Sequence, residues 1–144
     1  MLKIEIICIG DFKEKYWKDA QDEYLKRLSR FYNVETFVLK ESTKEKESQL
    51  LLSKIKGYCI LLDLGGNLIS SEELSSKISA LSQTNSKITF IIGGSEGVSQ
   101  KVKEKVNEKI SFGKITLPHQ LARVVLLEQI YRSATIANNI KYHK

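Results

Sequence analysis

Apolar runs of strand length alternate along this chain with segments in which apolar residues recur every three or four positions. The predicted strands are Leu2 to Ile9, Val34 to Leu39, Tyr58 to Leu62 and Ile88 to Ile92. The predicted helical segments are Lys15 to Phe31, the end of Lys40 to Lys54, Ser70 to beyond Leu81, Ser99 to Val106 and Pro118 to Asn138. This alternation is typical of an α/β domain with a mostly parallel sheet flanked by helices.

Short local signals mark several boundaries. Ser70 and Glu73, three residues apart, form a predicted capping box that opens a helix. The segment Asp63 to Asn67 contains two glycines and predicts a turn with positive φ angles. A small strand-like piece is predicted at Lys114 to Leu117, and Pro118 fits the first turn of the long helix that follows.

A glycine-rich loop, Gly93 to Gly97, follows a buried strand and precedes a helix. Open α/β sheets bind nucleotides and similar ligands at such a place. The loop does not match G-x-G-x-x-G, and Val98 stands where a phosphate-binding loop requires lysine, so a flavodoxin-like or other nucleotide-binding domain is disfavoured. A tight turn without a ligand is the alternative interpretation.

The last helix and the chain end carry further candidate chemistry. The segment Pro118 to Asn138 is apolar nearly all round, so it needs cover on more than one side, and a subunit interface is one way to provide it. Glu128 and Arg132 could form a simple intrahelical ion pair, and His119 could be structural. The terminal Tyr142-His143-Lys144 is notable because chain ends are usually frayed.

Composition limits the possible classes of protein. A chain of 144 residues with 42% hydrophobic content predicts one domain, residues 1–144, with a real core. The net charge of +6 favours a polyanionic partner, and the basic residues around the first helix are either phosphate contacts or solvated surface. Cys8 and Cys59 lie in apolar runs as core thiols, and the histidine and cysteine spacing matches no zinc site. Without a signal peptide or a membrane-spanning run, a cytoplasmic protein that binds no membrane and no metal is expected.

Three blocks of this sequence closely resemble one known family. They are FIIGGSEGVS, ITLPHQLARVVLLEQIYRSATI and the terminal YHK, and the opening KIEIICIGDFKEKYWKDAQDEYLKRLSRF is similar as well. They resemble the small SPOUT-class methyltransferases of the RlmH type, formerly called the YbeA family, over nearly the whole chain. The resemblance implies a parallel-sheet domain with a C-terminal trefoil knot and a homodimer that binds S-adenosyl-L-methionine in the knot. It also implies methylation of N3 of a pseudouridine in 23S ribosomal RNA, within the large subunit or the assembled ribosome.

The resemblance also implies site residues. The cofactor would be bound by Leu61, Leu62, Gly93, Phe112, Gly113, Lys114, Ile115, Thr116 and Leu117. Because N3 of a uracil-type ring must lose its proton, a base or fixed positive groups are needed, and the candidates are His119, Arg132, Tyr142 and His143. Candidate RNA contacts are Lys13, Lys15, Lys18, Arg27, Arg30 and Lys144. The alternative is a non-catalytic, basic, ribosome-associated RNA-binding factor.

Overall fold

Five parallel strands form the centre of the structure, a computed structural model that describes residues 1–144. The strands are β1 (Lys3–Ile9), β2 (Asn33–Leu39), β3 (Tyr58–Leu68), β4 (Lys87–Ile92) and β5 (Glu108–Ser111). Their order across the sheet is β2-β1-β4-β3-β5. The predicted α/β class with a parallel sheet is therefore confirmed.

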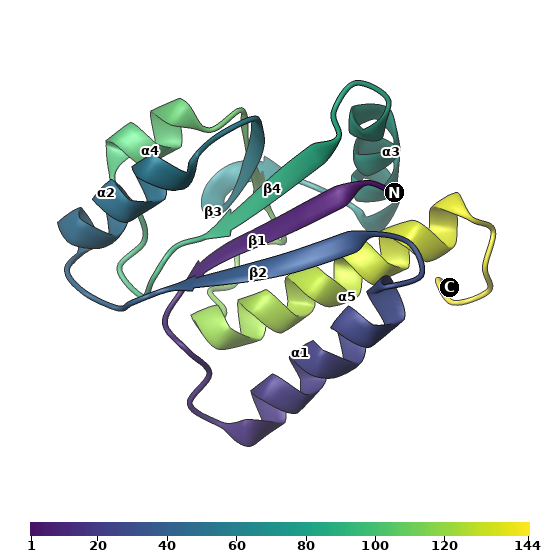
Figure 1. Cartoon of the computed structure of the whole chain (residues 1–144), viewed down its shortest axis with the longest axis horizontal. Coiled ribbons are helices and arrows are strands. Elements are labelled where there is room, and N and C mark those ends of the chain that lie inside the picture. Colours follow the sequence, from purple (N-terminus) through teal and green to yellow (C-terminus); the bar gives the residue numbers. More distant parts are fainter.

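Five helices cover the two faces of this sheet (Figure 1). One face carries α1 (Lys15–Leu28), α3 (Ser71–Ser82) and α5 (His119–Ala137), and the other carries α2 (Lys44–Lys54) and α4 (Gln100–Lys105). The predicted capping box is present, because Ser70 Oγ accepts the Glu73 N–H and the Glu73 carboxylate accepts the Ser70 N–H. None of the helices combines the length and apolar character needed to span a bilayer.

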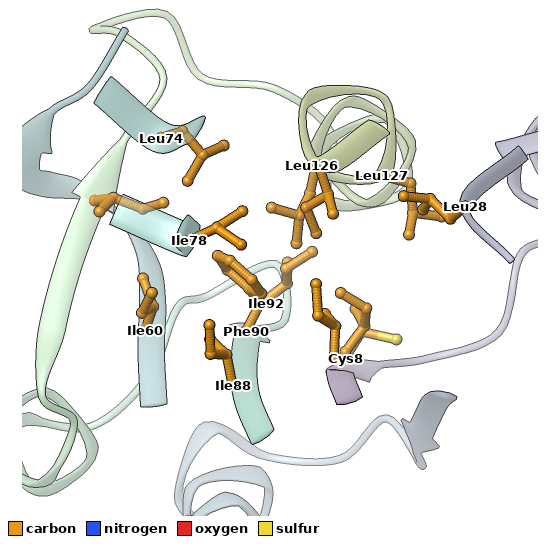
Figure 2. Close-up of a cluster of buried hydrophobic side chains, with 14 residues drawn as sticks. Cys8, Leu28, Ile60, Leu74, Ile78, Ile88, Phe90, Ile92, Leu126 and Leu127 are labelled. Atoms are coloured by element: carbon orange, nitrogen blue, oxygen red, sulfur yellow. The ribbon is translucent and has the colours of Figure 1, made fainter. Parts of the chain in front are cut away.

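Alternate residues of the strands point to opposite faces, so the sheet has two apolar cores. Under α1, α3 and α5, Phe90 of β4 packs among aliphatic side chains that include Leu74, Ile78 and Leu126 (Figure 2). Under α2 and α4, a smaller cluster contains Ile7, Ile91 and Val102. Both cysteines are buried free thiols. Burial raises the pKa of Cys8 to about 11, so this side chain is part of the packed core and not a nucleophile.

The turn predicted at Asp63 to Asn67 is wrong. Strand β3 continues to Leu68, and its pairing with β5 shifts so that both Leu62 and Asn67 lie opposite Ile110. Neither Gly65 nor Gly66 has a positive φ. Gly66 is required for a different reason, because a Cβ there would lie 2.7 Å from the Ile110 backbone nitrogen. The glycine permits two backbones to approach closely, and four extra residues bulge from β3 at the carboxyl edge of the sheet.

The strand-like piece predicted at Lys114 to Leu117 is also wrong. The last strand is Glu108–Ser111, and the chain leaves the sheet at Gly113, whose φ is +141°. Ser111 Oγ stabilises this exit, because it accepts the Gly113 N–H and donates to the Gly113 carbonyl. The following residues cross the carboxyl edge of the sheet and leave Ile115 80% exposed before α5 begins.

Candidate functional site

A pocket of about 490 Å³ lies at the carboxyl edge of the parallel sheet. Its wall is built from the middle of β3 (Leu61 to Leu64), the glycine loop after β4, the segment from Ser111 to Leu117, and the first turn of α5. All nine residues predicted to bind the cofactor line it, although they come from three segments far apart in sequence. His119 lines the same pocket. Leu64 and Ile115 expose apolar surface into it, so the pocket combines apolar walls with accessible backbone.

A second groove, of about 570 Å³, lies between α3, β5 and the end of β3. Six of its nine lining residues are polar, and two of them, Lys77 and Glu108, form an ion pair with each other. Tyr58 also donates to Glu108, so these charged groups already have partners. Because these charged side chains already pair with each other, we interpret the groove as structural. The pocket at the sheet edge is the better candidate for a ligand site.

The chain end is fastened to α5 and α3 by a continuous polar network. Arg132 donates to Glu128 Oε1 through Nε at 3.0 Å and to His143 Nδ1 at 3.1 Å. His143 Nε2 lies 2.5 Å from Glu72 Oε1 of α3. The Tyr142 hydroxyl donates to Glu128 at 3.2 Å, and its ring packs edge-on against Tyr131. The terminal residues are thus ordered by specific contacts rather than frayed.

The contacts of His143 define its tautomer. A guanidinium can only donate hydrogen bonds, so His143 Nδ1 accepts from Arg132 and Nε2 carries the proton that is donated to Glu72. In this arrangement the acceptor nitrogen is already occupied. His143 can act as a proton acceptor only after Arg132 or the tail moves.

The pKa shifts of Tyr142 and Arg132 indicate different roles for these two side chains in the network. Burial, then the charge of Glu128, raises the pKa of Tyr142 to about 12, so its hydroxyl is a donor and not a base at neutral pH. The hydrogen bonds to Glu128 raise the pKa of Arg132 above its usual value, so this side chain stays cationic. Two imidazoles, His119 and His143, remain as candidate proton acceptors among the predicted residues.

The predicted catalytic residues fall into two groups at opposite ends of α5. His119 lies at the pocket, whereas Arg132 is thirteen residues further along the helix, which corresponds to about 20 Å. Tyr142 and His143 fold back beside Arg132. One chain alone therefore does not bring the four predicted residues together.

Helix α1 runs beside α5 (Figure 1). The predicted RNA contacts on α1 and on the loop before it are therefore divided between the two ends of α5. Lys13 lies near the start of α5, since its N–H donates to Gln120 Oε1 at 3.0 Å, whereas Arg27 lies over the Tyr131 ring near the other end. Lys13 therefore lies close to the first turn of α5, which also lines the pocket of the same subunit.

Ion pairing further divides the predicted RNA contacts. Lys15, Lys18 and Arg27 each pair with a carboxylate four residues away, at 2.7 Å, 3.3 Å and 2.7 Å. Exposed pairs of this kind contribute at most about 1 kcal/mol, so a phosphate could still displace the carboxylate. The other three predicted contacts, Lys13, Arg30 and Lys144, form no ion pair and are the cations most available to a polyanion.

Comparison with known proteins gives the family of this chain. The family model described as "Predicted SPOUT methyltransferase" matches residues 2–143. The chain belongs to the SPOUT methyltransferase family. Proteins named ribosomal RNA large subunit methyltransferase H are similar over their whole length: that of Fusobacterium nucleatum is 48% identical, covering 99% of this chain and 100% of that protein. The one from Oenococcus oeni is 47% identical, with full coverage of both chains.

A solved structure confirms the fold of this SPOUT protein. A probable methylase family protein from Haemophilus influenzae matches with a TM-score of 0.57 at 14% identity, covering 98% of this chain and 70% of that one. At this low identity the likeness concerns the fold alone. The trefoil knot stays a prediction of the family resemblance.

Several residues of this SPOUT protein's site could not be singled out from its sequence. Asp63 and Leu64 line the pocket, but the two glycines after them indicated a turn. Gly94 and Ser95 line it too, and their place in the glycine loop was an available signal. Glu72, the partner of His143, had no signal, because only the folded chain brings α3 beside the tail.

Proposed function

We propose that this chain transfers a methyl group from S-adenosyl-L-methionine to N3 of a pseudouridine in 23S ribosomal RNA, in the cytoplasm. One observation carries the proposal: three separate segments that the sequence assigned to the cofactor line a single pocket at the carboxyl edge of the parallel sheet. Membership in the SPOUT family supports methyl transfer, and the names of the full-length relatives support large-subunit ribosomal RNA as the substrate.

The pocket fits the proposed cofactor in size and in chemistry. Its volume lies within the range of about 300 to 1,000 Å³ that small-molecule sites occupy. Leu64, Ile115 and Leu117 offer apolar surface for an adenine ring, and the backbone of the Ser111 to Leu117 segment offers hydrogen-bonding groups. When bound, S-adenosyl-L-methionine supplies a methyl group activated by a sulfonium.

Methyl transfer to N3 requires that the imide proton leave as the nitrogen attacks the methyl carbon. The new N–CH₃ bond forms as the S–CH₃ bond breaks, and the proton passes to a base or to water. Among the predicted residues, His119 or His143 would accept that proton, the Arg132 cation would stabilise the developing anion, and the Tyr142 hydroxyl would donate to it.

A homodimer would unite the two groups of residues that one chain holds apart. Helix α5 keeps Leu121, Val124, Val125 and Ile136 only half-buried after packing on the sheet, α1 and α3. Burying this face against a second copy gives a twofold contact in which the pocket end of one α5 can approach the tail end of the other. In this arrangement His119 of one subunit would act with Arg132, Tyr142 and His143 of its partner.

We expect sedimentation at micromolar concentration to show a dimer and no monomer, because the half-buried face of α5 is apolar. A composite site is tested by mixing His119→Ala chains with Arg132→Ala chains, each inactive alone. Random exchange makes half of the dimers mixed, and one of the two sites in each is wild type, so about one quarter of full activity returns. A stable monomer near 16.4 kDa contradicts the dimer, and mixtures that stay inactive contradict the shared site.

The activity itself is tested by two measurements. Calorimetric titration with S-adenosyl-L-methionine is expected to show specific binding, whereas a non-catalytic ribosome-associated factor would show none. Mass spectrometry of ribosomal RNA from a deletion strain is expected to reveal an unmethylated pseudouridine that the purified protein methylates in ribosomes or large subunits from that strain. A fully methylated RNA in the deletion strain would contradict the proposal.

A further inference from the structure

Arg123 of α5 is a buried cation without an acidic partner. Only 2% of the residue is exposed, and it forms no ion pair. Nη1 donates to the Gly10 carbonyl at 2.8 Å, Nη2 donates to Gln21 Oε1 at 3.2 Å, and Nε has no partner. Burial lowers the pKa of the guanidinium, which reflects the unfavourable removal of its charge from water. The negative charge of Asp11 acts in the opposite direction, but its carboxylate forms no ion pair with Arg123. Both hydrogen bonds of this buried cation go to neutral groups, so its position needs a reason.

The contacts of Arg123 converge on the loop between β1 and α1, residues Gly10 to Glu14. The guanidinium carbon lies 3.8 Å from the centre of the Phe12 ring, in stacking contact. Gln120, one turn earlier on α5, accepts the Lys13 N–H at 3.0 Å. This loop is therefore fastened to the first turns of α5 at three positions: Gly10, Phe12 and Lys13.

The same loop lies close to two segments that line the proposed cofactor pocket, the glycine loop and the first turn of α5. Strand β1 lies beside β4, so the loops that follow these two strands are neighbours at the carboxyl edge of the sheet. A Cβ added to Gly94 in the glycine loop would lie 3.4 Å from Ile9 Cγ2, at the end of β1. Gln120 directly follows His119, which lines the pocket.

The loop contains one cation, Lys13, and two carboxylates, Asp11 and Glu14, neither of which forms an ion pair with it. Lys13 is exposed and forms no ion pair, whereas the next lysines along the chain, Lys15 and Lys18, each pair with a carboxylate. Because the Lys13 backbone is held by Gln120, the start of this side chain is fixed next to the first turn of α5, while its ammonium forms no ion pair. A fixed and unpaired cation beside the pocket suits a phosphate of the RNA that enters it.

We propose that Arg123 is a positioning residue that holds the Gly10 to Glu14 loop so that Lys13 contacts an RNA phosphate beside the pocket of its own subunit. This inference rests on the proposed function. Arginine suits the role because its planar group stacks on Phe12 while its fork donates to two other groups, which a lysine ammonium cannot reproduce.

The salt dependence of ribosome binding tests the proposal. Each phosphate contact contributes about 0.7 to 0.9 to the slope of log K against log salt concentration. Lys13→Gln is expected to reduce the slope by that amount. Arg123→Lys keeps the net charge and is expected to reduce the slope equally, because the loop no longer places Lys13. The double variant should lose nothing more, and the dissociation constant for S-adenosyl-L-methionine should change less than about twofold in all three.

Two further variants separate positioning from stability. Phe12→Leu removes the stacking partner from the loop itself and is expected to reproduce the effect of Arg123→Lys, so the test stands if Arg123→Lys does not fold. Ile78→Val, in the α3 core, lowers stability without touching the loop and should leave the slope unchanged. The proposal is overturned if Arg123→Lys and Phe12→Leu keep the wild-type slope, or if either adds fully to Lys13→Gln. Absence of methylation by the wild-type protein would instead overturn the proposed function.

Discussion

Deletion of Tyr142, His143 and Lys144 is expected to slow methyl transfer at least about a hundredfold, the scale associated with loss of a positioned acid, base or charge-stabilising group. The deletion removes an imidazole and a hydroxyl donor, and it leaves Arg132 with only Glu128 as a partner. Cofactor affinity is expected to stay nearly intact, because no tail residue lines the pocket. Single-turnover methylation of unmodified ribosomes, with calorimetry in parallel, measures both effects.

The tail is packed, so its deletion also has a modest cost in stability. The edge-on contact between Tyr131 and Tyr142 contributes about 1 kcal/mol, which thermal unfolding would register without loss of the fold. Deletion of Lys144 alone separates the loss of a candidate RNA contact from the loss of Tyr142 and His143, since it leaves the aromatic contact and His143 in place. Near-normal turnover after the full deletion would remove the tail from the active site and leave His119 and Arg132 as the candidates.

Gly93→Val is expected to abolish binding of S-adenosyl-L-methionine. A Cβ at position 93 would lie 2.7 Å from Val98 Cγ1 and 3.3 Å from the Gly97 carbonyl carbon, so any side chain must push the glycine loop out of shape. Glycine at a ligand site can make room for the ligand, because it has no Cβ. The structure gives a different reason, because the space is needed by the loop's own residues. Calorimetry on the folded variant measures the loss.

A paired substitution distinguishes these two reasons. Val98→Ala removes the methyl group that a Cβ at position 93 would strike. If glycine is needed at position 93 to keep the loop in shape, Gly93→Ala weakens cofactor binding strongly. The double variant Gly93→Ala/Val98→Ala then regains most of the affinity. If glycine is instead needed to make room for the ligand, Val98→Ala does not restore the affinity. Unchanged affinity in folded Gly93→Val would place the cofactor elsewhere.

The elements with strong local signals were predictable from the sequence. Strands β1 and β4 are nearly pure apolar runs, and α3 begins at its capping box. The end of β3 was not predictable, because paired glycines indicate a turn far more often than a close approach of two backbones, which is what Gly66 provides. The pairing of β3 with β5 depends on contacts distant in sequence, which local periodicity does not encode.

The candidate site shows the same division. The glycine loop and the segment before α5 were found because a strand end followed by glycine has a physical meaning for ligand binding. The separation of His119 from Arg132 follows from helix geometry and could have been calculated in advance. The contacts of Arg123 with Gly10 and Phe12 could not, because they join residues about a hundred positions apart whose neighbourhood exists only in the folded chain.

Pairing of the first strand with the fourth also governs the order in which the molecule can assemble during synthesis. Strand β1 can pair with β2 early, since their partners Lys3 and Asn33 are close in sequence. The other edge of β1 pairs with β4, which is synthesised much later, because Thr89 of β4 lies 84 positions beyond its partner Glu5. Until residue 92 has been added, the growing chain exposes an unpaired, apolar strand edge that can recruit other chains. We expect the pairing of β1 with β4 to remove this exposed edge.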